Sequence, residues 1–155
     1  MCKFKSAIVL RNGDILHNPY TDSHEDLIRL RKLDDSSQFI NRFVRVEFSP
    51  PDNSTLTDVS TYVLKVDEYS TPDWFNDIWD GVIERLRDIV RQMIVDHDED
   101  VIIGRAVILG KINVNKLINC LVVNAGYAMI QDAGSATIRH AGSATIINKQ
   151  NAKIL

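Results

Sequence analysis

Short segments in the first 70 residues have hydrophobic residues at every second position, which is the period of a β-strand. Residues 43–48 alternate Val or Phe with Arg or Glu, and residues 62–67 repeat such a pattern. Residues 3–10 are rich in strand-forming residues. We therefore expect a small antiparallel sheet in which the strands of residues 43–48 and 62–67 are partners.

Turn and cap signals lie between these segments. Asn12-Gly13 follows the first strand, and an Asn-Gly pair suits the two positive φ angles of a type I′ hairpin turn. Residues 15–16 would then form the returning strand. Ser23 stands three residues before Asp26, a spacing that predicts the start of a short helix.

The hydrophobic period becomes helical from residue 71 onward. Thr71 and Pro72 suit the first turn, and hydrophobic residues from Phe75 to Met93 and Ile94 then recur at spacings of three and four. A stripe of roughly 20 residues is about 30 Å long. Because this exceeds what a small sheet needs to cover it, we expect part of the helix to pack against another subunit.

The last third of the chain contains an eight-residue repeat with the consensus x-A-G-x-A-x-I-x. Its plainest copies begin at Asn124, Asp132, His140 and Asn148, and about six blocks fit between residues 108 and 155. Each block predicts one short strand, with the Ala and Ile of positions five and seven on one face and Gly at a corner. A short β-solenoid is favoured over the alternative, an antiparallel meander of hairpins. The repeat ends without a polar cap, which again favours self-association.

Charge divides the chain at the same place. The chain has 155 residues and a net charge of −3, yet residues 101–155 contain six basic residues and one acid, whereas residues 1–100 carry a charge of −8. We therefore expect an α+β module in residues 1–100, with a small antiparallel sheet and one long amphipathic helix, and a β-solenoid-like repeat tail in residues 101–155.

Composition also bears on location. No hydrophobic run approaches the roughly 20 residues that span a bilayer, and no secretion signal is present. Cys2 and Cys120 are expected to be free thiols. The expected location is the cytoplasm.

Motifs that would indicate an enzyme are absent from the sequence. Neither a metal-binding His or Cys spacing nor a phosphate-binding glycine loop occurs, and no cofactor is expected. Metal binding by the acidic run of residues 96–100 is conceivable, but a solvated helix end is the better interpretation. A small hydrolase using His24 with Glu25 and Asp26 is a minor alternative, because these acids also suit a helix start.

A binding site is the remaining candidate. Trp74 and Trp79 could stack on a base, although packing of the helix against the sheet explains them more simply. The candidate ligand-binding residues are Trp74, Trp79, Arg45, Lys65 and Arg139. Sequence-specific DNA binding is not expected, because the cations of the tail are sparse.

The chain resembles a family of phage and prophage proteins. The resemblance rests on CKFKSAIVL, SHEDLI, FVRVEFSPPD, the stretch from YVLKVD to TPDWF, and the tail of (G/D)-(N/S)-A-T-(V/I) units. It implies a phage-type setting, and hence the host cytoplasm, but no catalytic residues.

Together these features predict a non-enzymatic homo-oligomer that binds a small anionic, nucleotide-like ligand, such as a host defence signal. The alternative is an assembly module whose solenoid drives multimerisation. A chain of this kind is expected to act without a membrane or a specific DNA partner.

Overall fold

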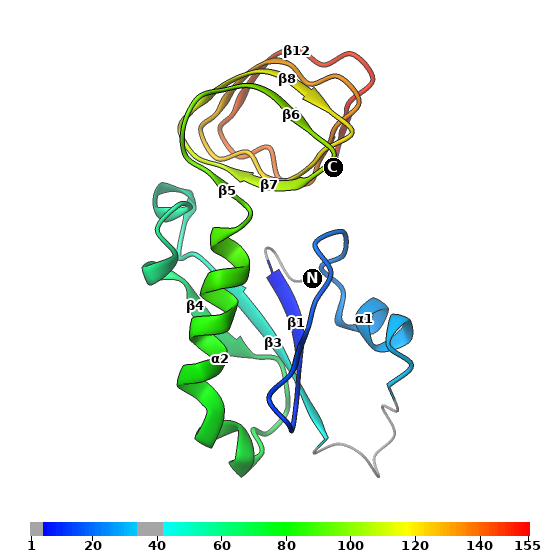
Figure 1. Cartoon of the computed structure of the whole chain (residues 1–155), viewed down its shortest axis with the longest axis vertical. Helices are drawn as coiled ribbons and strands as arrows, with labels where there is room; N and C mark the ends of the chain where they lie inside the picture. Colours follow the sequence, from blue (N-terminus) through cyan, green and yellow to red (C-terminus); the bar gives the residue numbers. More distant parts are fainter. Residues whose placement is uncertain (1–4, 34–41) are drawn as a thin grey trace. The chain divides into compact units, whose positions relative to one another are not determined.

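The computed structural model of the chain describes residues 5–33 and 42–155. It contains two compact units, one made of Met1–Ser49 and Tyr62–Asp88 and the other of Pro50–Thr61 and Ile89–Leu155. The first is an α+β unit, and the second contains a β-solenoid (Figure 1). The predicted fold class is therefore confirmed.

The first unit is built on a four-stranded antiparallel sheet with the order β2-β1-β3-β4. Its strands are β1 (Lys5–Leu10), β2 (Ile15–Leu16), β3 (Phe43–Ser49) and β4 (Val63–Val66). Val46 lies opposite Val66 and Phe48 opposite Leu64, so β3 and β4 are partners as the alternation predicts. The side chains of Val44, Val46 and Phe48 are fully buried, which confirms that they share the core face.

The hairpin between β1 and β2 has a different turn from the one predicted. Gly13 has φ +90°, but Asn12 has no positive φ, so the type I′ expectation is wrong. The amide of Gly13 donates to Leu10 O (2.8 Å), and the amide of Leu10 donates to Asp14 O (2.8 Å). These two bonds close a three-residue loop with a bulge at Gly13, which needs only one residue with positive φ.

Two helices accompany this sheet. Helix α1 (His24–Leu30) begins at Ser23, whose hydroxyl accepts a bond from the amide of Asp26, as predicted. It packs Leu27 and Ile28 against Ile8 and Phe43. Helix α2 (Asp73–Arg91) lies along the opposite face, with Phe75, Val82, Leu86 and Val90 fully buried (Figure 1).

The predicted end of the long helix is wrong. Helix α2 stops at Arg91, and Ile94 begins the first strand of the solenoid. Met93 and Ile94 fit the spacing of the helical stripe, but they are hydrophobic because they lie at the start of a buried strand. The spacing alone does not distinguish these two causes. The solenoid thus begins ahead of the charge change at residue 101.

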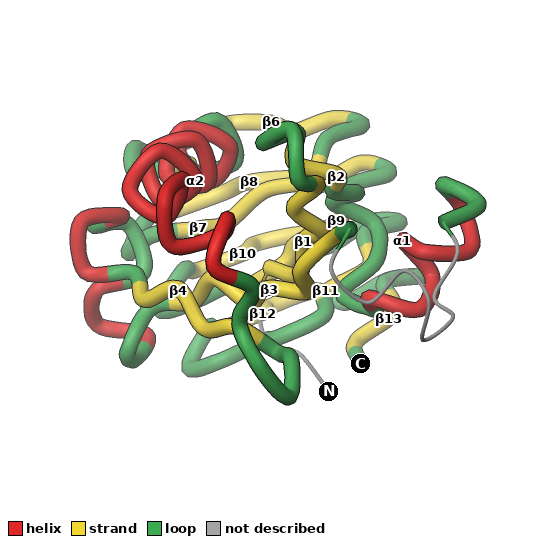
Figure 2. Tube along the Cα trace, turned by 90° about the horizontal axis from the view of Figure 1, so that it is seen from below, coloured by secondary structure: helices red, strands yellow, loops and turns green. Residues whose placement is uncertain are grey.

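The second unit is a parallel β-solenoid of about four coils. One sheet has the order β12-β10-β8-β6 and the other β13-β11-β9-β7-β5. The strands are β5 (Ile94–Val95), β6 (Glu99–Ile103), β7 (Ala106–Leu109), β8 (Asn113–Ile118), β9 (Leu121–Asn124), β10 (Met129–Asp132), β11 (Thr137–Ile138), β12 (Thr145–Asn148) and β13 (Lys153–Ile154). Figure 2 shows successive coils as stacked bands of β6, β8 and β10. Every strand pair is parallel, so the antiparallel meander is wrong.

One coil contains two eight-residue blocks. Met129 pairs with Asn113 on one side and Thr145 on the other, each 16 residues away. Alternate blocks therefore contribute to opposite sheets. The Ala and Ile side chains of the repeat fill the space between the two sheets, and Ala128, Ile130 and Ile138 are fully buried.

A segment of residues 50–61, hereafter the strap, belongs to the same unit as the solenoid. It contains two single-turn 3₁₀ helices, Asn53–Thr55 and Val59–Thr61. Leu56 and Val59 are its buried side chains.

Among the described residues, no helix is long and hydrophobic enough to cross a membrane. Cys120 is a free, buried thiol, as predicted. Cys2 lies outside the described residues.

Candidate ligand-binding groove

An open groove of about 970 Å³ lies in the first unit, on the sheet face that carries Arg45 and Lys65. Successive side chains of a strand point to opposite faces of the sheet, and Val44 and Val46 point into the core. The side chains of β3 and β4 that point the other way form the floor of the groove. One wall is the start of α1, and the other is the segment that follows β4. The described lining residues are Asp22, Ser23, His24, Glu25, Arg45, Glu47, Lys65, Val66, Asp67, Glu68 and Tyr69.

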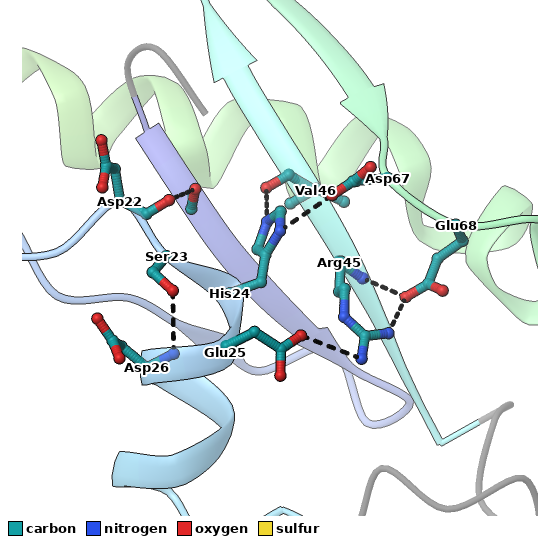
Figure 3. A network of polar contacts seen from close by, with 10 residues as sticks. Asp22, Ser23, His24, Glu25, Asp26, Arg45, Val46, Asp67 and Glu68 are labelled. Carbon is teal, nitrogen blue, oxygen red and sulfur yellow. Dashed lines mark hydrogen bonds and ion pairs between the residues drawn. The ribbon is translucent and has the colours of Figure 1, made fainter. Parts of the chain in front are cut away.

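His24 connects the two walls of the groove. It lies in the first turn of α1 and is only 8% exposed. Its Nε2 is 2.8 Å from the carbonyl oxygen of Val46, which can only accept, so Nε2 carries a proton. Its Nδ1 is 3.2 Å from a carboxylate oxygen of Asp67. His24 thus links α1 to β3 and to the end of β4 (Figure 3).

Arg45 and Glu68 form the second connection in the groove. One Glu68 oxygen accepts from the backbone amide of Arg45 (2.9 Å) and from its guanidinium (3.0 Å). Both side chains are largely buried, at 17% and 14% exposed. Glu25 approaches the same guanidinium at 4.0 Å (Figure 3). Arg45 therefore faces two carboxylates, one on each wall.

This geometry does not support acid–base catalysis by His24. Both ring nitrogens already have partners, so none is left for a reacting proton. Asp26 accepts a bond from the Thr21 hydroxyl, and its amide is bound by Ser23, as expected for a helix start. The described residues contain no group of three His, Cys, Asp or Glu placed to hold a metal.

The structure brings only two of the five predicted site residues together. Arg45 and Lys65 both line the groove. Trp74 lines a separate pocket with Arg11 and Asp73. Trp79 makes an edge-to-face contact with Phe75 on α2, with the ring centroids 5.4 Å apart. Arg139 follows β11 in the second unit.

Residues that the sequence did not single out complete the groove. Asp67, Glu68 and Tyr69 follow β4 directly, and Tyr69 is fully exposed at the rim. The only sequence signal is their position at the end of a strand, where polar side chains often gather. Asp67 pairs with His24 on α1 and Glu68 pairs with Arg45 on β3, which is 23 residues away, so no local pattern links these residues to their partners.

The acidic run of residues 96–100 lies on the solenoid and not at a helix end: it spans the turn after β5 and the first two residues of β6. Hydrogen bonds that the His97 ring donates to the carboxylates of Asp96 and Glu99 raise the pKa of His97. The amide of Asn113 lowers the pKa of Asp98. Asp100 bonds to Asn115 on the neighbouring strand. Part of this charge is therefore used to join successive coils.

Comparisons with protein-family models, curated proteins and solved structures found no match. The resemblance to phage proteins consequently stays an expectation from the sequence.

Proposed function

We propose that the protein is a non-enzymatic binding module whose groove takes a small ligand with a positively charged group. The observation that carries this is the charge of the lining. Among the described lining residues, five are carboxylates, and these outnumber the two basic residues, Arg45 and Lys65. Arg45 is also already paired with Glu68.

An anionic ligand fits this groove less well. A phosphate would have to displace Glu68 or Glu25 from Arg45 while facing Glu47 and Asp67 on the same surface. Like charges at such distances oppose binding, whereas an amine is attracted to them. The groove therefore favours the opposite charge to the nucleotide-like ligand expected from the sequence.

Titration with spermidine, followed by calorimetry, tests this proposal. We expect saturable binding of spermidine, and binding about three- to tenfold weaker in Glu47→Gln, because one carboxylate of the floor is lost. Glu84→Gln, on the exposed side of α2 and outside the groove, is the matched control. An equal loss of spermidine affinity in Glu47→Gln and Glu84→Gln would show non-specific attraction. A flat spermidine titration of the wild-type protein would reject the proposal.

A second candidate function is self-association through the solenoid. Four large hydrophobic side chains are exposed on the outer face of the sheet β12-β10-β8-β6, namely Val101 (42%), Ile103 (62%), Met129 (41%) and Ile147 (60%). Large exposed hydrophobic side chains on one face of a sheet are a feature of interfaces.

Light scattering after size exclusion tests self-association. We expect a homo-oligomer that dissociates in the double variant Ile103→Glu, Ile147→Glu. Tyr20→Glu, at an exposed position in the first unit, is the control. A monomeric wild-type protein would contradict this second candidate.

A further inference from the structure

The strap runs along a row of glycine corners in the solenoid. A Cβ atom on Gly110 would meet Thr57 at 2.9 Å, and one on Gly126 would meet Leu56 at 2.9 Å. On Gly142 it would lie 3.2 Å from the Asn53 amide nitrogen. Each coil therefore meets a different part of the strap, and glycine is what permits the close approach.

Polar contacts fix the strap in this position. The side-chain amide nitrogen of Asn124 donates to the side-chain oxygen of Asn53 (3.1 Å). The side-chain oxygen of Asn124 in turn accepts from the amide of Gly126 (2.8 Å). Leu56 is 3% exposed, so the strap is also held by a buried side chain.

A cavity of about 360 Å³ lies between the strap and the solenoid. This volume falls in the lower part of the range for small-molecule sites. Leu56, Leu109, Gly110 and Gly126 form its buried base, whereas the strap residues Ser54 and Thr57 and the solenoid residues Lys111 and Tyr127 are its exposed walls. The remaining described lining residue is Asn53.

The chemistry of this lining differs from that of the groove. Lys111 is the only charged residue among the described lining residues, and none is a carboxylate. Two acids flank the strap residues of the lining in sequence, and each accepts bonds from the amide and hydroxyl of a serine two residues later: Asp52 from Ser54, and Asp58 from Ser60. The half-exposed ring of Tyr127 offers a surface for stacking. A cation and an aromatic ring that line the same cavity suit a ligand that is both planar and negatively charged.

We propose that the cavity under the strap is a binding site for a small planar anion of the nucleoside monophosphate class. Lys111 pairs with the phosphate, and Tyr127 stacks on the base. The site lies wholly within the second unit and is independent of the groove.

Titrations with AMP, adenosine and inorganic phosphate test this proposal. We expect saturable binding of AMP that is tighter than binding of either adenosine or phosphate. Lys111→Gln should weaken AMP binding about tenfold, because a charge-assisted bond is lost. Tyr127→Leu should remove the advantage of AMP over phosphate.

Lys116→Gln is the matched control, because Lys116 lies on the outer side of β8 and undergoes the same change of charge. Amide shifts of Gly110 and Gly126 should follow the AMP titration, whereas that of Gly81 on α2 should not. Thermal unfolding checks that each variant is folded. The proposal is overturned by a flat AMP titration, by equal loss in the Lys111 and Lys116 variants, by phosphate or adenosine binding as tightly as AMP, or by shifts that do not include the two corner glycines.

Discussion

Glycine has different roles at two corners of the solenoid. Gly134 has φ +49°, and a Cβ atom there would lie 2.2 Å from the carbonyl oxygen of Leu117. Gly104 has φ +63°, but a Cβ atom there would meet nothing within 4 Å. At Gly134 a side chain is excluded both by the contact with the neighbouring coil and by the positive φ. At Gly104 a side chain is disfavoured only by the positive φ.

We therefore predict that Gly104→Ala lowers the free energy of unfolding by roughly 1–2 kcal/mol, the cost of the left-handed conformation. Gly134→Ala should lower it clearly more, because the coils must also separate locally. Urea unfolding measures both values. Equal losses would contradict the close approach of the coils at Gly134.

His17 illustrates the effect of burial on a titrating residue. Desolvation, helped by the charges of Lys5 and Arg31, lowers the pKa of His17 from 6.5 to about 4. Between these two pH values the unfolded chain binds more protons than the folded one. The stability that depends on neutral His17 is therefore present above pH 6.5 and lost as the pH falls toward 4.

The variant His17→Gln should show a weaker loss of stability in this window than the wild type, measured by urea unfolding at several pH values. His97→Gln is the control with the opposite sign, because the raised pKa of His97 gives a contribution that is lost as the pH rises. Parallel pH profiles for wild type and His17→Gln would refute the shift.

At the scale of elements, α2 is a regular amphipathic helix with one weak point. Gly81 lies on its exposed side, and a Cβ atom there would meet nothing within 4 Å. Glycine in a helix interior costs conformational entropy that alanine does not.

We predict that Gly81→Ala raises the free energy of unfolding by about 0.5–1 kcal/mol, measured by urea unfolding. Spermidine and AMP titrations should be unchanged, because Gly81 lines neither site. A loss of stability would indicate that this side of α2 is covered.

The turns of the solenoid contain a recurring hydrogen bond that the repeat consensus does not reveal. Position one of the block is Asn or Asp in three of the four plainest copies, the exception being His140. The side-chain oxygens of Asn124, Asp132 and Asn148 each accept from the amide two residues later. The sequence consensus treats this position as variable. Its regularity is visible only in the hydrogen bonds, since Asn and Asp make the same turn contact.

At the scale of the whole molecule, the acidic and basic parts of the chain suggest a further test. The sequence favours electrostatic attraction between copies, whereas the exposed side chains of the solenoid favour a hydrophobic contact. Salt weakens electrostatic attraction between copies, whereas it leaves a hydrophobic contact unchanged or makes it stronger.

We expect the association of copies to persist at high ionic strength, because the proposed interface contains Ile103 and Ile147. Sedimentation velocity at low and high salt measures this. Dissociation by salt would instead support packing through opposite charges.

The sequence by itself determined the elements whose signals are local. The alternation of residues 43–48, the cap at Ser23 and the stripe of α2 each depend on neighbours within one or two turns, and the structure confirms them. The repeat determined the solenoid in the same way, since the four plainest blocks, from residue 124 onward, carry Ala and Ile at the same two positions. The tertiary structure alone decided that two blocks make one coil, because only the pairing of strands 16 residues apart shows the length of a coil. It also decided which side chains meet at the groove and under the strap. His24 reaches Asp67 and Asn53 reaches Asn124 only after folding has brought residues 43 and 71 positions apart into contact, and no local periodicity encodes such pairs.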